Sequence, residues 1–495
     1  MKPGRLLIRA DADAKIGTGH VMRCIALAQE WQKLGGTVSL ATKLLPDKLA
    51  ALLASEAIEI LQIDEKSPDY LQTVNVANAL KVQCVVLDGY GFGAEHQRAL
   101  RNAGIRQLLI DDFGHTDSYC ADFVLNANLG ASPAIYDSRD SATTLLLGSR
   151  FAMLRRDFAE FRNWTREFPD KAHRLLVSMG GADPQNVTAV VLKALSELKQ
   201  GHLHIRTIVG PANLHRPELE SIARSSRHQI ELVISPEMPE LMMWADLAIS
   251  AAGTTCYELM FTRLPFIAVA IADNQRRTAH ALEEAGIARV QFWPEQFQAT
   301  RLAQMAEELI ENPDLRKLQA ERGAKMIDGL GAQRLAKILN SGLVLRNAEQ
   351  TDCKLIWEWS NDPVTRSVSF STAPIGWDEH VRWYEMRLKD VNSVMWIAET
   401  QESVPQGLVR FAIEQESASI SVNLSPVCRG KGIGSDLIEI GTERLLSEFP
   451  KVRTIDAYIK QDNERSVHAF EKCGFEKTTD ILINGHASLH YVLHR

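Results

Sequence analysis

The first segment with the residues for chemistry is a short turn that contains Gly17 and Gly19 and leads directly into His20. The strand-like run LLIRAD precedes this turn, and residues 20–34 follow it with helical spacing. Glycine lets the backbone approach a phosphate closely, and the free amides at a helix N-terminus favour negative charge. The turn therefore predicts an anion site with His20 beside it. A purely structural turn, in which His20 only caps the helix or meets solvent, is the alternative.

Two later clusters, SMGGADPQNVT and SAAGTTCYEL, repeat the order of strand, glycine turn and helix. Amides and hydroxyls of such turns can hold a diphosphate, while a carboxylate one turn later accepts ribose hydroxyls. The carboxylate in question is that of Glu258, for which a solvated helix charge is the alternative. The residues expected to bind a nucleotide sugar are Gly17, Gly19, Gly180, Gly181, Asp183, Asn186, Gly253, Thr254, Thr255 and Glu258.

A fourth glycine turn lies in CRGKGIGSDLIEIGTERLL, near the other end of the chain. Its consecutive backbone amides, backed by a helix predicted over 435–446, would hold a pyrophosphate, and two basic side chains add charge. The residues of this turn are Arg429, Gly430, Lys431, Gly432, Ile433 and Gly434.

The length, composition and net charge of the chain indicate what kind of protein positions these turns. With 495 residues the chain exceeds what one core usually supports, and we expect three domains. A content of 45% hydrophobic and 24% charged residues is typical of a globular protein, and the net charge of -7 argues against a broad nucleic-acid surface. No run suits a signal peptide or a transmembrane helix, and the seven scattered cysteines suit reduced thiols, so we expect a cytoplasmic protein that does not bind membranes.

Apolar strand-like runs alternate with helical stretches along most of the chain, which predicts α/β winding around parallel sheets. A first Rossmann-like domain is expected over 1–168 and a second over 169–340. Ligands of such sheets bind beyond the carboxyl ends of the strands, so the two domains should face one another across a cleft. Near residue 340 a fresh strand, LVLRNAEQTD, opens a third domain over 341–495.

Residues 5–340 resemble the UDP-2,4-diacetamido-2,4,6-trideoxy-β-L-altropyranose hydrolases, which have the GT-B fold. The resemblance rests on ordered segments: RADADAKIGTGHVMRCIALA, VLDGYGFG, LIDDFGH, LLGSRFAMLRRDF, SMGGADPQNVT, ADLAISAAGTTCYEL and IADNQ. It implies that water cleaves the bond between the sugar and the diphosphate with inversion, and that His20 is catalytic, as base or as cation. It also implies that Tyr90 lies near the attacking water and that Asp88 helps to polarise the site, although a strand-end Asp and a packed Tyr would look the same.

The same resemblance places Asn274 and Gln275 beside the sugar, where loop caps are the alternative explanation, and it implies no metal. The final third resembles the GCN5-related N-acetyltransferases (GNAT) through RGKGIG and QDNERSVHAFEKCGFEK. This implies acetyl-CoA as co-substrate, bound by the RGKGIG turn and by Asn463 and Ser466. The pattern departs at Phe470, where many such enzymes have the tyrosine that reprotonates the thiolate. No acid is therefore assigned, and Glu379 and His380 are only local possibilities for the base.

Taken together, we expect a bifunctional enzyme of pseudaminic acid synthesis. Its C-terminal domain would acetylate the 4-amino group of a UDP-linked deoxyamino sugar, and its N-terminal half would hydrolyse the product. One alternative is a GT-B glycosyltransferase that passes the sugar to an acceptor, and another treats the GNAT-like domain as a docking or binding module.

Overall fold

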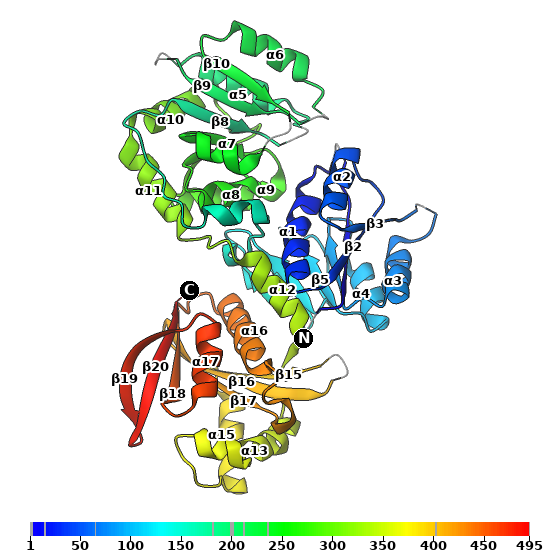
Figure 1. Ribbon diagram of the computed structural model, residues 1–495, viewed down its shortest axis with the longest axis vertical. Coiled ribbons are helices and arrows are strands. Elements are labelled where there is room, and N and C mark those ends of the chain that lie inside the picture. Colours follow the sequence, from blue (N-terminus) through cyan, green and yellow to red (C-terminus); the bar gives the residue numbers. More distant parts are fainter. Residues whose placement is uncertain are drawn as a thin grey trace.

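The computed structural model describes residues 3–13, 16–64, 66–180, 183–198, 202–210, 213–234, 237–400 and 403–494. These residues form three sheets that follow one another along the chain (Figure 1). The first two sheets are parallel and the third is mixed, which confirms the predicted α/β class with two Rossmann-type sheets and a separate third one. Gly181, predicted to bind the nucleotide sugar, lies outside the described residues.

The first sheet is parallel and buried on both faces, so its strands are almost continuous apolar runs. Its strands, in spatial order, are β3 (Glu59–Gln62), β2 (Thr37–Thr42), β1 (Arg5–Ala10), β4 (Cys84–Asp88), β5 (Gln107–Ile110), β6 (Phe123–Asn126) and β7 (Thr144–Leu147). Its α-helices are α1 (Gly19–Lys33), α2 (Asp47–Ser55), α3 (Asp69–Leu80) and α4 (Ala94–Asn102). The strand order reverses between β1 and β4, and this creates a crevice at their carboxyl ends.

The second sheet repeats this winding and has its own reversal between β8 and β11. Its strands, in spatial order, are β10 (Gln229–Val233), β9 (His204–Ile208), β8 (Arg174–Ser178), β11 (Leu247–Ala251), β12 (Phe266–Ala270) and β13 (Ala288–Phe292). Its helices are α5 (Val187–Ser196), α6 (Arg216–Ser225), α7 (Met238–Trp244), α8 (Thr255–Phe261), α9 (Asp273–Glu284), α10 (Ala299–Glu311) and α11 (Pro313–Ala324).

Helix α12 (Gly331–Ser341) then leaves the second sheet and packs against α1 of the first (Figure 1). Arg106 of the first sheet donates hydrogen bonds to the carbonyls of Ile338, Leu339 and Leu343, and so satisfies acceptors at the end of this helix. The domain limits expected from the sequence remain a prediction, and this return helix is a feature that the sequence analysis did not suggest.

The third sheet is antiparallel except between β17 and β18, which pair in parallel. Its strands, in spatial order, are β14 (Val344–Asn347), β15 (Ser393–Glu399), β16 (Pro405–Glu414), β17 (Ser417–Leu424), β18 (Thr454–Lys460), β20 (His486–His494) and β19 (Glu476–Ile483). Its helices are α13 (Cys353–Asn361), α14 (Pro363–Val368), α15 (Trp377–Lys389), α16 (Ile433–Glu448) and α17 (Glu464–Lys472).

Helix α16 lies between the third sheet on one side and α12 and β7 on the other. It is buried almost all round, and one continuous apolar core joins the first sheet, α12 and the third domain. Polar contacts cross the same boundary: Ser447 accepts the backbone N–H of Leu147 at 3.1 Å, and Glu443 pairs with Arg150 at 2.7 Å. The third domain is therefore packed against the first.

Across the described ranges, no helix combines the length and apolarity needed to cross a membrane. The same ranges contain no group of three His, Cys, Asp or Glu side chains arranged to hold a metal ion. All seven cysteines are free thiols.

Candidate active site and acetyltransferase turn

The turn with Gly17 and Gly19 follows β1, and Asp88 ends the neighbouring strand β4. These residues therefore meet at the reversal point of the first sheet, where open α/β sheets bind ligands. Gly17 has a φ of +81°, a left-handed conformation that suits glycine, and nothing would contact a Cβ atom at either glycine within 4 Å. The backbone of the turn is thus open to a ligand.

His20 is buried in the first turn of α1, and its Nδ1 lies 2.6 Å from Oδ1 of Asp88. Burial would raise the pKa of Asp88, but Arg23 and then His20 outweigh burial and hold this pKa far below its usual range. In the neutral form of His20, an ionised carboxylate at this distance favours the tautomer with the proton on Nδ1, which leaves Nε2 as an acceptor. This arrangement can orient and deprotonate a water molecule, as a general base does.

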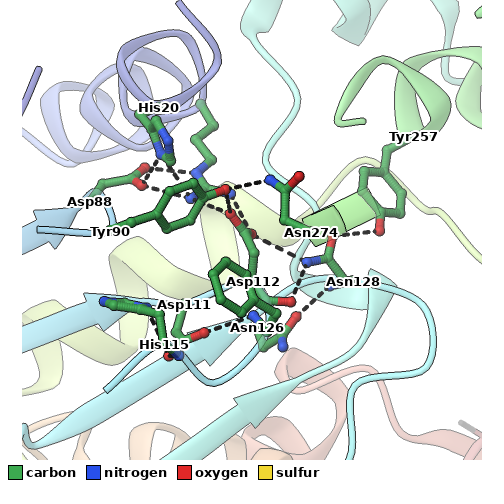
Figure 2. Close-up of polar contacts among 12 residues, drawn as sticks. His20, Asp88, Tyr90, Asp111, Asp112, His115, Asn126, Asn128, Tyr257 and Asn274 are labelled. Carbon is green, nitrogen blue, oxygen red and sulfur yellow. Dashed lines mark hydrogen bonds and ion pairs between the residues drawn. The ribbon is translucent and has the colours of Figure 1, made fainter. Parts of the chain in front are cut away.

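Tyr90 packs its ring edge-on against His20, with 5.0 Å between ring centroids (Figure 2). Its hydroxyl donates to Oδ2 of Asp112 at 3.0 Å and accepts from Nδ2 of Asn274 at 2.7 Å. Burial, and then the charge of Asp112, raise the pKa of Tyr90, so the phenol stays protonated. Asn274 lies in the first turn of α9 in the second domain, so this bond spans the cleft between the two domains. The structure thus brings together four residues predicted from distant segments: His20, Asp88, Tyr90 and Asn274.

Four further residues of this network were missed in the sequence analysis: Arg23, Asp112, Asn128 and Tyr257. Arg23 lies between two carboxylates, with its guanidinium 2.6 Å from Asp88 and 2.7 Å from Asp112. Its place three residues after His20, on the same helix face, is a signal that could have found it. Asp112 stands in the segment LIDDFGH and Tyr257 in ADLAISAAGTTCYEL, whereas Asn128 lies outside the segments that carry the resemblance.

In the second domain, the predicted cradle residues gather at the reversal point between β8 and β11. Gly180 follows β8 with a φ of +90° and open space around it, and Gly253 to Thr255 connect β11 to α8. Glu258 lines a cavity between the two domains together with Thr254, Arg155 and Gly19. Burial raises the pKa of Glu258 to about 7, against the opposing effect of Arg155. A carboxyl group in this state changes its hydrogen-bonding capacity near neutral pH.

Three other residues predicted to bind the sugar nucleotide have partners within the protein. Asp183 is buried and accepts the backbone N–H groups of Val187 and Thr188, which is the role of a helix cap. Asn186 donates to Glu218, and Gln275 accepts the backbone N–H of Ile271. Their contacts are those of local structure, and a direct role in binding remains a prediction.

In the third domain, the RGKGIG turn leads into α16, which begins at Ile433. Gly430 and Gly432 have φ values of +75° and +85°, and a Cβ atom added at either position would have no neighbour within 4 Å. Lys431 is exposed, whereas the guanidinium of Arg429 is held by Asp362 and Thr365. The backbone of the turn is therefore available to an anion, but the charge of Arg429 is balanced within the protein.

The second segment that resembles the GNAT family, QDNERSVHAFEKCGFEK, also contains residues that bond within the protein. Asn463 caps α17 by accepting the backbone N–H of Ser466, so both residues sit at a helix N-terminus. Phe470 is buried against Phe475 and puts no hydroxyl where the tyrosine was expected. His380 is buried, and its Nε2 lies 2.9 Å from the carbonyl of Cys353. His380 therefore has a partner within the protein core, and its suggested role as the base for acetyl transfer remains a prediction.

Comparison with known proteins finds two family models that match separate parts of the chain. Residues 175–335 match the glycosyltransferase family 28 C-terminal domain, and residues 342–476 match an acetyltransferase (GNAT) domain. An uncharacterized protein of Methanocaldococcus jannaschii is 22% identical over 96% of this chain and 97% of its own length, so the similarity extends across both halves.

Two other relatives each match one half. The UDP-2,4-diacetamido-2,4,6-trideoxy-β-L-altropyranose hydrolase of Campylobacter jejuni is 24% identical over 57% of this chain and 97% of its own. The spermidine N(1)-acetyltransferase of Vibrio cholerae is 26% identical over 30% of this chain and 88% of its own. The chain is thus a fusion of a GT-B-like half, homologous to UDP-2,4-diacetamido-2,4,6-trideoxy-β-L-altropyranose hydrolases, with a C-terminal GNAT acetyltransferase domain.

Proposed function

We propose that the N-terminal half hydrolyses UDP-2,4-diacetamido-2,4,6-trideoxy-β-L-altropyranose to the free sugar and UDP. The observation that carries this proposal is the ionised Asp88 behind His20 at the reversal point of the first sheet. Nε2 of His20 takes a proton from water, the water oxygen attacks the anomeric carbon, and the bond from that carbon to the diphosphate breaks with inversion. UDP leaves with the bonding electrons, and the amides of the glycine turns stabilise its charge.

The same geometry supports the binding roles that we propose. Gly180 and the turn at Gly253, Thr254 and Thr255 cradle the diphosphate, and Glu258 accepts the ribose hydroxyls. Tyr90 and Asn274 lie on opposite sides of the cleft and would enclose the sugar. No metal is assigned a role in this scheme.

For the third domain we propose acetyl transfer from acetyl-CoA to the 4-amino group of the precursor UDP-linked sugar. The amine nitrogen attacks the thioester carbonyl and loses one proton, the carbon–sulfur bond breaks, and the CoA thiolate takes up one proton, so the transfer is balanced. The open RGKGIG turn supports CoA binding by backbone amides. The product of this reaction is the substrate of the hydrolase, so the fusion would join consecutive cytoplasmic steps of pseudaminic acid synthesis.

The test is to incubate the full-length protein and its His20→Ala variant with the UDP-diacetamido sugar, without acceptor or metal, and to follow free sugar and UDP by NMR. We expect the variant to lose roughly 10²- to 10⁴-fold in kcat, the usual contribution of general base catalysis. Acetyl-CoA turnover by the same variant serves as the internal control for folding. Release that requires an alcohol acceptor would instead favour a glycosyltransferase, and wild-type protein without acetyl transfer would favour a docking role for the third domain.

A further inference from the structure

The carboxylate of Asp112, shortly after β5, accepts hydrogen bonds from several residues of the cleft. Its side chain is 13% exposed. It receives hydrogen bonds from three residues of the first domain: the hydroxyl of Tyr90 at 3.0 Å, the guanidinium of Arg23 at 2.7 Å and the amide of Asn128 at 3.2 Å. Figure 2 shows Asp112 between Tyr90 and Asn128.

Two of these three partners also receive a hydrogen bond from the second domain. Asn274 donates to the hydroxyl of Tyr90 at 2.7 Å, and the hydroxyl of Tyr257 donates to Oδ1 of Asn128 at 2.9 Å. These two bonds span the cleft at separate points, yet each ends on a residue that Asp112 holds. The third partner, Arg23, also pairs with Asp88, and Asp88 in turn contacts His20.

We propose that Asp112 is a positioning residue that couples closure of the two domains to the placement of Tyr90 and of the His20–Asp88 pair. This inference rests on the proposed hydrolase function. A carboxylate only accepts hydrogen bonds, so it takes the single hydroxyl proton of Tyr90 and leaves the phenol oxygen to accept from Asn274. An asparagine here would have one acceptor oxygen and would turn an NH2 group toward Arg23 or Tyr90, both of which are donors.

The neighbouring Asp111 provides a matched control. Its carboxylate accepts the backbone N–H groups of Phe113 and Gly114 and the hydroxyl of Tyr119. It also pairs with His115 at 3.1 Å. The rings of Phe113 and His115 pack against Tyr90, so Asp111 affects Tyr90 through ring packing, whereas Asp112 accepts hydrogen bonds directly from Tyr90, Arg23 and Asn128. The same substitution at the two adjacent positions therefore separates loss of positioning from loss of local stability.

The experiment compares the full-length wild type with D112N, D111N, Y90F and the double variant D112N/Y90F. With the UDP-diacetamido sugar as substrate, we expect D112N to lower kcat about 10- to 100-fold, as expected for misplacement of catalytic groups by about 1 Å. We expect D111N to lower the Tm and to reduce kcat less than D112N does, because the carboxylate of Asp111 makes no hydrogen bond to Tyr90, Arg23 or Asn128. Because Asp112 acts in part through Tyr90, the losses of D112N and Y90F should be less than additive.

UDP affinity, measured by calorimetry, gives a readout that does not depend on hydrolysis. Closure requires Asp112, so D112N should weaken UDP binding by several-fold while D111N leaves it unchanged. A D112N variant with wild-type kcat and UDP affinity, or one whose losses match those of D111N, would overturn the inference. A wild type that binds UDP but releases no sugar would instead refute the hydrolase proposal, and the effect of D112N on UDP affinity would still test the role of Asp112.

Discussion

The interdomain cleft and the RGKGIG turn are the two proposed sites for phosphate-bearing ligands, and they are built in different ways. In the cleft, side chains from both domains contact one another: Asn274 reaches Tyr90, and Tyr257 reaches Asn128. At the turn, the available groups are backbone amides and the exposed Lys431, while the side chain of Arg429 is bound to Asp362. A site made of side chains needs the assembled fold, whereas a site made of amides needs only a short sequence with the right glycines. The turn is not fully independent of the rest of the fold, because α16, the helix that follows it, packs against α12 and β7.

The largest effect is expected when the third domain is separated from the first two, which tests whether the RGKGIG turn can form and work without them. A fragment that begins at residue 343 would expose the face of α16 that packs on α12 and β7, and Glu443 would lose Arg150. We expect this fragment to aggregate or to unfold at a clearly lower temperature than the same domain in the full chain, because the two share one apolar core. Thermal unfolding followed by circular dichroism measures the effect.

The two halves expressed together as separate chains are the control, and they should associate and recover stability. If the isolated fragment turned over acetyl-CoA with full-chain kinetics and stability, the turn would need only its own sequence. The proposed requirement for the interface with α12 and β7 would then be refuted.

The next largest effect is expected at the turn itself. Gly432→Ala places a side chain at a φ of +85°, which costs about 1–2 kcal/mol. The turn relieves this strain by changing its conformation, and its amides then no longer converge on the pyrophosphate. We expect the Kd for acetyl-CoA to rise about tenfold, which corresponds to about 1.4 kcal/mol, while sugar release by the first two domains is unchanged.

Gly485→Ala is the matched variant, since Gly485 has a φ of +79° and open space in the turn between β19 and β20. It carries the same strain at a distance from the proposed CoA site. Equal weakening of acetyl-CoA binding by both substitutions would show that the effect comes from stability and not from the amides.

A smaller, pH-dependent effect is expected in the cleft. The pKa of Glu258 is raised to about 7, so the carboxylate is ionised above this pH and protonated below it. In the proposed binding mode ionised Glu258 accepts both ribose hydroxyls. UDP affinity should therefore fall by several-fold as the pH drops from 8 to 6, two values chosen about one unit either side of this pKa. Calorimetric titration of UDP across this range measures the change.

Glu258→Gln should remove the pH dependence and bind UDP with the lower affinity at every pH. An unchanged pH profile in this variant would assign the titration to another group. It would favour the alternative given in the sequence analysis, in which Glu258 is a charged helix residue without a role in binding.

What the sequence determined is largely local. The strand-like runs and glycine turns predicted β1, β4, β8 and β11, and α1 was expected within one residue of its observed limits. Apolar periodicity reports burial of a segment, and glycine reports a backbone conformation, so both can be read without a partner. For the same reason, the two parallel sheets and the RGKGIG turn could be predicted before any contact between them was known.

Only the tertiary structure decided which side chains meet. It placed Asp112 between Arg23, Tyr90 and Asn128, gave Asp183 the role of a helix cap, and buried His380 in a core. It also showed α12 returning to the first sheet and α16 covered by the other half of the chain. A side chain's role depends on the charge, the donors and the burial that distant segments bring to it, and these follow from how the strands and helices pack, which local sequence patterns do not record.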